Sequence, residues 1–144
     1  MLSRDEIKAV LKKWNQAWDK HDLNGVMELF HEDILFENWT GGKARGKKAL
    51  NQAWEPWFRN HGRFKFSQED LFIDEAEQKV LYQWRLAWPS SEKGFTGQSE
   101  QRRGLDILHF RNGKIIRKFT YSKTTVEING KRVKLMAEGG GNLP

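Results

Sequence analysis

Near Arg63 the spacing of apolar residues changes, and this change limits the folds that the chain can adopt. Before Arg63, apolar residues recur every three or four positions, which is the spacing of helices that bury one side. After it, apolar and polar residues alternate, as they do in strands with one buried face. Helices followed by strands predict an α+β fold, in which the helices cover one face of a curved, mainly antiparallel sheet.

The first expected helix begins at a capping box. Ser3 and Glu6 have the Ser-x-x-Glu spacing in which each side chain accepts a hydrogen bond from the other residue's backbone N–H. Apolar residues then follow at helical spacing. They are Ile7, Val10, Leu11, Trp14 and Trp18.

Two more helices are expected before Arg63. A short one follows a break at residues 21–22 and runs over residues 23–30, and a third begins near residue 47 and ends at Gly62. Pro56 is expected to kink or shorten the third helix. A strand over residues 34–38 and a glycine-rich loop separate these two helices. The apolar stripe of the third helix comprises Leu50, Ala53, Trp54, Trp57 and Phe58.

The second part of the chain is expected to form strands joined by tight turns. Two of the turns are the dipeptides Asn112-Gly113 and Asn129-Gly130, which favour two-residue hairpin turns. The expected strands cover residues 63–73, 78–88, 100–110, 114–128 and 131–135. On the second of them, one face carries Val80, Tyr82, Trp84, Leu86 and Trp88.

The length of 144 residues fits a single domain, which we expect to cover residues 1–136. Residues 137–144 have only Leu143 as a packing side chain, so a flexible C-terminal tail is expected there. The N-terminus has no signal-peptide pattern, and no apolar run approaches the length of a membrane span. These features favour a cytoplasmic protein without a membrane segment.

The formal net charge is +6, which raises the possibility of nucleic-acid binding. The lysines and arginines lie beside turns or at alternating strand positions and form no single cluster, so an ordinary solvated surface is the better interpretation. We do not expect a nucleic-acid partner. If there were one, its affinity would fall steeply with salt concentration.

The composition also argues against a metal and against cofactors that need cysteine. The chain has no cysteine, which excludes disulfides, thiolate metal ligands and cysteine nucleophiles. The four histidines are scattered without the spacing of a metal site. They are His21, His31, His61 and His109. We therefore expect neither a metal nor a cofactor.

One carboxylate stands where core residues are expected. Asp106 lies two positions before Leu108 and four before Phe110, so it shares their face of an apolar strand. Such a group must line a cavity, stay protonated or find a partner of opposite charge. Two interpretations remain open: an acid in a pocket, or an ion-pair partner of Arg85, Arg103 or Lys118.

Two segments resemble a known superfamily. Residues 21–50, "HDLNGVMELFHEDILFENWTGGKARGKKAL", and residues 104–115, "GLDILHFRNGKI", are similar to signature segments of the nuclear transport factor 2-like superfamily. This superfamily includes the SnoaL-like polyketide cyclases and the ketosteroid isomerases. The resemblance implies a cone-shaped α+β barrel, with three N-terminal helices packed on a strongly curved mixed sheet around a pocket. It does not select a function, because the fold hosts enzymes, scaffolds and transport factors.

The resemblance also implies positions for the site. Asp106 takes the place of the strand aspartic acid that forms part of the oxyanion hole in ketosteroid isomerases. Trp14 stands in place of their tyrosine, and Asn38 in place of their catalytic base. An amide cannot carry the proton, and Glu37 points to the opposite strand face unless the match slips by one residue. Steroid isomerisation is therefore not expected.

Two hypotheses about function follow. The first is a hydrophobic pocket for a small, flat, apolar carbonyl compound, with general acid/base chemistry of the isomerase or cyclase type by Asp106. The second is a domain of the same fold that binds a ligand or a second copy of itself without catalysis. In both, a homodimer is expected to form through the sheet face turned away from the helices, with Ile107 and His109 as candidate contacts.

The candidate ligand-binding residues are mainly tryptophans. Each of these rings has an alternative role as ordinary core, because large aromatic side chains are usually buried for packing. The full candidate set for binding comprises Trp14, Trp18, Asn38, Trp54, Trp57, Trp84, Lys118 and Ser122.

Overall fold

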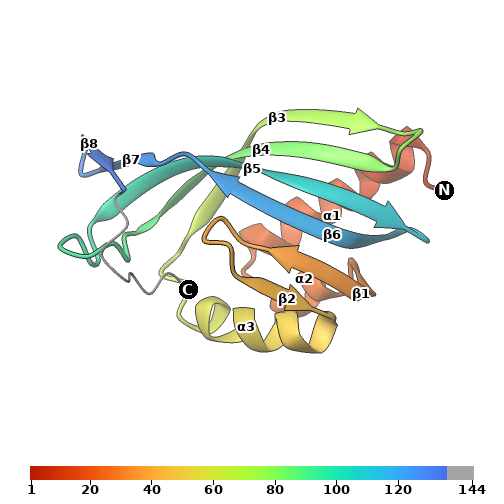
Figure 1. Ribbon diagram of the computed structural model, residues 1–144, viewed down its shortest axis with the longest axis horizontal. Helices are drawn as coiled ribbons and strands as arrows, with labels where there is room; N and C mark the ends of the chain where they lie inside the picture. The colour runs from red at the N-terminus through yellow and green to blue at the C-terminus, as the bar shows by residue number, and fades with distance from the viewer. Residues whose placement is uncertain (136–144) are drawn as a thin grey trace.

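The computed structural model describes residues 1–135 (Figure 1). As predicted, all three helices come before the long run of strands, and a pair of strands separates the second helix from the third. The helices are α1 (Arg4–Asp19), α2 (Leu23–Met27) and α3 (Lys47–Arg59). The strands are β1 (Phe30–Glu37), β2 (Lys43–Arg45), β3 (Lys65–Asp74), β4 (Lys79–Pro89), β5 (Ser99–Arg111), β6 (Lys114–Ser122), β7 (Thr125–Ile128) and β8 (Lys131–Lys134).

The strands form one mixed and strongly curved sheet. Its order is β2-β1-β6-β5-β4-β3; β1 and β6 run parallel, and the other neighbouring strands run antiparallel. The hairpin of β7 and β8 attaches to the start of β5 and extends from one end of the sheet (Figure 1). The three helices lie along one face of the sheet, so the predicted α+β arrangement is confirmed.

The capping box of α1 is present. Ser3 Oγ accepts a hydrogen bond from the Glu6 backbone N–H, and Glu6 Oε1 accepts one from the Ser3 backbone N–H. These bonds satisfy donors that the first turn of a helix leaves free. The apolar residues predicted for this helix face the sheet. The buried ones are Ile7, Leu11, Trp14 and Trp18, while Val10 is half-buried.

Four local predictions need correction. The second helix ends at Met27, and Phe30 is the first residue of β1 rather than the last of the helix. Residues 43–45 of the expected loop form β2, because they pair with the end of β1. The third helix ends at Arg59, three residues after Pro56 and before the expected Gly62. The long strand expected over residues 114–128 is divided into β6 and β7.

Both predicted Asn-Gly turns are confirmed. Asn112 and Gly113 have φ values of 51° and 78°, and Asn129 and Gly130 have values of 50° and 77°. Positive φ at both central residues is the requirement of the hairpin turn that matches strand twist. The β5–β6 hairpin also contains a β-bulge between His109 and Phe110. The bulge shifts the pairing of all residues beyond it by one position.

Gly104 allows close packing inside the curved sheet. It pairs with Trp84 on β4, and a Cβ atom at this position would lie 2.5 Å from Trp84 Cη2 and closer still to the Tyr121 carbonyl oxygen. Only a residue without a side chain can be accommodated here. The indole of Trp84 can therefore lie across β5 on the face that is turned toward the helices.

The proposed extent of the domain, residues 1–136, stays a prediction. The expected tail, residues 137–144, lies outside the described residues. Within residues 1–135, no helix has both the length and the apolar composition that crossing a membrane requires.

Candidate functional site

A cavity of about 690 Å³ lies between the helices and the inner face of the sheet. It is bounded by α1, α3, the end of β1 and the strands β3 to β6. Its volume falls within the range of sites that bind small organic molecules. All seven tryptophans of the chain line it, namely Trp14, Trp18, Trp39, Trp54, Trp57, Trp84 and Trp88.

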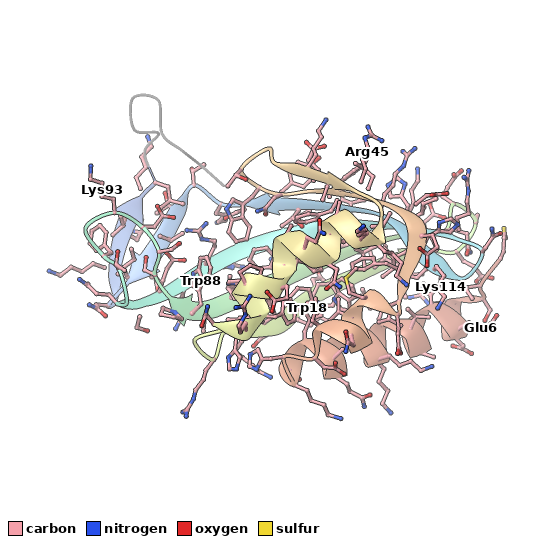
Figure 2. The ribbon with its side chains drawn as sticks, turned by 90° about the horizontal axis from the view of Figure 1, so that it is seen from below. Glu6, Trp18, Arg45, Trp88, Lys93 and Lys114 are labelled. Carbon is pink, nitrogen blue, oxygen red and sulfur yellow. The ribbon has the colours of Figure 1, made fainter. Side chains whose placement is uncertain are left out.

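Trp18 is the central ring of this wall. Figure 2 shows it between α1 and α3, with Trp88 farther along the same side of the molecule. The ring centroid of Trp18 lies 5.4 Å from those of Trp54 and Phe66 and 6.0 Å from that of Trp57. The two interpretations of the tryptophans are thus compatible, because rings that pack in the core also form the cavity wall.

A buried polar cluster interrupts the aromatic wall. Lys118 Nζ lies 3.0 Å from Asp106 Oδ1 and 2.6 Å from Thr120 Oγ1, and the Thr120 hydroxyl donates to Asp106 Oδ1 over 2.6 Å. All three side chains are buried, and all three line the cavity. Asp106 therefore combines both sequence interpretations: it lines the cavity, and it is paired with Lys118.

The sheet register explains this cluster. Asp106 on β5 lies directly opposite Thr120 on β6, and Lys118 is two residues earlier on the same face of β6. Lys118 Nζ also lies 4.9 Å from the ring centroid of Phe36 and 5.6 Å from that of Trp54. Burial lowers the pKa of Lys118, although the charge and hydrogen bond of Asp106 oppose this shift.

Tyr82 and Asn15 form a second polar pair at the cavity. Tyr82 on β4 lies opposite Asp106, and its hydroxyl donates to Asn15 Oδ1 over 2.6 Å. Burial raises the pKa of Tyr82, and the charges of Asp106 and Asp19 raise it further. Tyr82 is thus a neutral phenol at physiological pH. No sequence pattern identified this pair as site residues, although Tyr82 shares its strand face with Trp84.

A second charged cluster surrounds Arg102, which also lines the cavity. The guanidinium lies 4.8 Å from the ring centroid of Trp39 and 5.5 Å from that of Trp88. Its Nε donates to Glu100 Oε2 over 3.1 Å, and one Nη donates to Glu92 Oε1 over 2.9 Å. Sequence reasoning missed this cluster. Strand alternation could have found it, since Arg102 and Asp106 are four residues apart on one face.

The remaining predicted residues divide between the cavity and its surroundings. Asn38 lines the cavity just after β1, and its Oδ1 accepts a hydrogen bond from the Trp39 backbone N–H over 2.8 Å. Ser122 does not line the cavity, and its hydroxyl donates to the carbonyl oxygen of Lys123. Among residues 1–135, no three His, Asp or Glu side chains form a group suited to hold a metal ion.

Three helices on a curved mixed sheet, closed around an aromatic cavity, are the arrangement of the nuclear transport factor 2-like fold. A family model described as the SnoaL-like domain matches residues 11–118, which is more than half of the chain. The chain therefore belongs to the SnoaL-like family, as the two signature segments predicted. No curated protein sequence matches it significantly.

Solved structures with a similar fold come from several bacteria. An NTF2-like protein of unknown function from Mesorhizobium loti is 20% identical, with a TM-score of 0.68, and the match covers 85% of this chain and 96% of that one. A protein provisionally described as a polyketide cyclase, from Xanthomonas campestris pv. campestris, is 16% identical, with a TM-score of 0.69 and coverages of 83% and 92%. One provisionally described as a ketosteroid isomerase, from Kribbella flavida, is 14% identical, with a TM-score of 0.65 and coverages of 83% and 78%. At these identities the likeness shows the fold alone.

Proposed function

We propose that this protein binds a flat, largely apolar carbonyl compound in the aromatic cavity and transfers a proton on it. The observation that carries the proposal is the buried cluster of Asp106, Lys118 and Thr120 in a wall otherwise rich in tryptophan. Stacked rings suit a flat apolar ligand, and a few convergent polar groups are what orient it. The provisional descriptions of similar structures as a cyclase and an isomerase agree with this chemistry.

Asp106 is the proposed general base. The hydrogen bonds from Lys118 and Thr120 are both accepted by Oδ1, so Oδ2 is left to take a proton from the ligand. Asn38 and Trp14 are proposed to hold the carbonyl oxygen, because each carries an N–H donor at the cavity wall. The substrate would then lose a proton next to its carbonyl group.

Hydrogen exchange into a simple ketone tests this function. We expect 2-acetylnaphthalene to quench tryptophan fluorescence saturably, and the protein to accelerate exchange of its methyl protons in D2O. Asp106→Asn should reduce the acceleration at least about 100-fold, since the amide cannot accept the proton. Asp70→Asn, an exposed change on β3, is the matched control and should leave it unchanged. Each variant is first shown to be folded by circular dichroism.

Two outcomes would overturn the proposal. One is that 2-acetylnaphthalene causes no saturable quenching. The other is that a folded Asp106→Asn variant exchanges the methyl protons as fast as the unmodified protein does. An oligonucleotide, added in the same fluorescence assay, is expected to cause no saturable quenching.

We also propose a homodimer that forms through the outer face of the sheet. Phe72, Leu81, Ile107 and Phe119 lie opposite one another across β3, β4, β5 and β6, and so form a continuous apolar row. Phe72 remains 60% exposed in the single chain. An uncovered apolar row of this kind is typical of a self-association surface.

Light scattering after size exclusion tests the dimer. At tens of micromolar, we expect the mass of two chains, whereas Ile107→Glu should give the mass of one chain because it places a charge in the apolar row. Lys12→Glu makes a larger change of charge on the exposed side of α1 and should leave the dimer intact. A monomeric unmodified protein would disprove the proposal.

A further inference from the structure

We infer that Lys118 is a nucleophile whose amine forms an imine with the carbonyl carbon of an aldehyde or ketone in the cavity. This inference rests on the proposed function, because the carbonyl compound has to occupy the same cavity. It adds a covalent step and assigns it to one side chain.

The position of Lys118 is unusual for a lysine. It is only 5% exposed and lines the cavity between the rings of Phe36 and Trp54. Within residues 1–135, Lys65 is the one other lysine at the cavity wall, and it is exposed and paired with Asp19. A flat compound stacked on these rings would bring its carbonyl group to the amine of Lys118 and not to a solvated lysine.

An amine attacks a carbonyl carbon only in its neutral form. Burial in the aromatic wall lowers the pKa of Lys118, because the ammonium loses its hydration there. Asp106 Oδ1 is 3.0 Å away and can take the proton directly, which converts the ion pair into a neutral amine and a carboxylic acid. An apolar ligand that fills the cavity excludes water and favours this neutral pair.

Lys118 and Asp106 together supply and accept every proton that imine formation requires. The amine of Lys118 attacks the carbonyl carbon while the Asp106 carboxylic acid protonates the carbonyl oxygen, and the Asp106 carboxylate then takes a proton from nitrogen. The resulting carbinolamine has its hydroxyl protonated by Asp106 and loses it as water, which leaves an iminium ion on Lys118 and a carboxylate on Asp106. The products are one iminium and one water, with no change of total charge.

Thr120 is the proposed positioning residue. Its hydroxyl lies 2.6 Å from both Lys118 Nζ and Asp106 Oδ1, so it holds the amine at a fixed place beside the acid. Its loss should slow formation of the imine without preventing ligand binding. If Thr120 only supported the fold, its replacement would not slow imine formation while leaving ligand binding unchanged.

Reductive trapping tests the inference. The full chain is incubated near neutral pH with 2-naphthaldehyde and cyanoborohydride, and the modified lysines are identified by mass spectrometry. We expect Lys118 to be modified at least about tenfold faster than the exposed Lys12, because the cavity holds the aldehyde beside the Lys118 amine and burial lowers the pKa of this lysine. Excess 2-methylnaphthalene, which has no carbonyl group, should protect Lys118 and leave modification of Lys12 unchanged.

Variants separate this inference from the proposed function. Lys118→Arg should remove the fast modification and Thr120→Val should slow it, while both variants still bind 2-methylnaphthalene as judged by fluorescence. If the unmodified protein binds 2-methylnaphthalene but modifies Lys118 no faster than Lys12, the nucleophile is disproved and the ligand cavity stands. If neither naphthalene compound binds, both proposals fail.

Discussion

Asp106→Asn is expected to lower the free energy of unfolding by about 3–5 kcal/mol near neutral pH. The substitution preserves the shape of the side chain, but Lys118 loses its counter-charge while it stays buried. Lys118 must then either remain charged in an aromatic wall or give up its proton. Deprotonating a lysine of ordinary pKa at neutral pH costs at most roughly 5 kcal/mol, which agrees with the expected loss. Urea denaturation of both proteins measures the difference.

The loss of stability caused by Asp106→Asn should become smaller as the pH rises. In the Asp106→Asn variant the folded state holds Lys118 with a lowered pKa, so the unfolded chain binds more protons and stability increases with pH. Stability increases over the pH range between the lowered pKa of Lys118 and the ordinary lysine value near 10.5. The double variant with Lys118→Met should recover most of the loss at neutral pH, because no buried charge remains. A loss below about 1 kcal/mol for Asp106→Asn would contradict the ion pair.

Arg102→Met should be nearly as destabilising, with an expected loss of about 3–5 kcal/mol. Glu100 is fully buried, with 0% of its surface exposed, and Arg102 supplies its counter-charge. Trp88 and Ser90 still donate hydrogen bonds to Glu100 in the variant, but neither carries a positive charge. The cation–π contacts of the guanidinium with Trp39 are lost as well.

The neighbouring Arg103 provides a matched control for this prediction. It lies on the same strand and forms an ion pair with Glu69 at 2.8 Å, but both partners are partly exposed. Arg103→Met should therefore cost much less stability than Arg102→Met, because solvent screens an exposed ion pair. Adding Glu100→Gln to Arg102→Met should restore part of the lost stability. Equal losses for Arg102→Met and Arg103→Met in urea denaturation would show that the buried cluster is not held by its charges.

Most of the fold could be predicted from the spacing of apolar residues. The change of spacing at Arg63 indicated helices that cover a sheet, and the Asn-Gly dipeptides located two of the hairpin turns. The strand β2 was not predictable, because Lys43–Arg45 shows no apolar alternation and is ordered by pairing with β1. Local spacing says little about a strand that only tertiary pairing stabilises.

The site was less predictable than the fold. A hairpin closed by Asn112-Gly113 without irregularity would place Asp106 opposite Phe119, and Lys118 would share a face with Ile107. The β-bulge instead brings Thr120 opposite Asp106 and turns Lys118 toward the cavity. Alternation thus identified Asp106 as an inward residue and left Lys118 as one of three candidate partners. The choice among the three depended on a one-residue shift that has no signal in residue type.

The bulge in β6 also has an evolutionary consequence. Because the shift is one residue, a single deletion between Ile115 and Lys118 would restore the plain hairpin and exchange the two faces of β6 beyond it. Phe119 and Tyr121 would then enter the cavity, while the lysine and the threonine moved to the outer face. Descendants of one ancestral chain can therefore gain or lose polar chemistry in the cavity by the insertion or deletion of one codon.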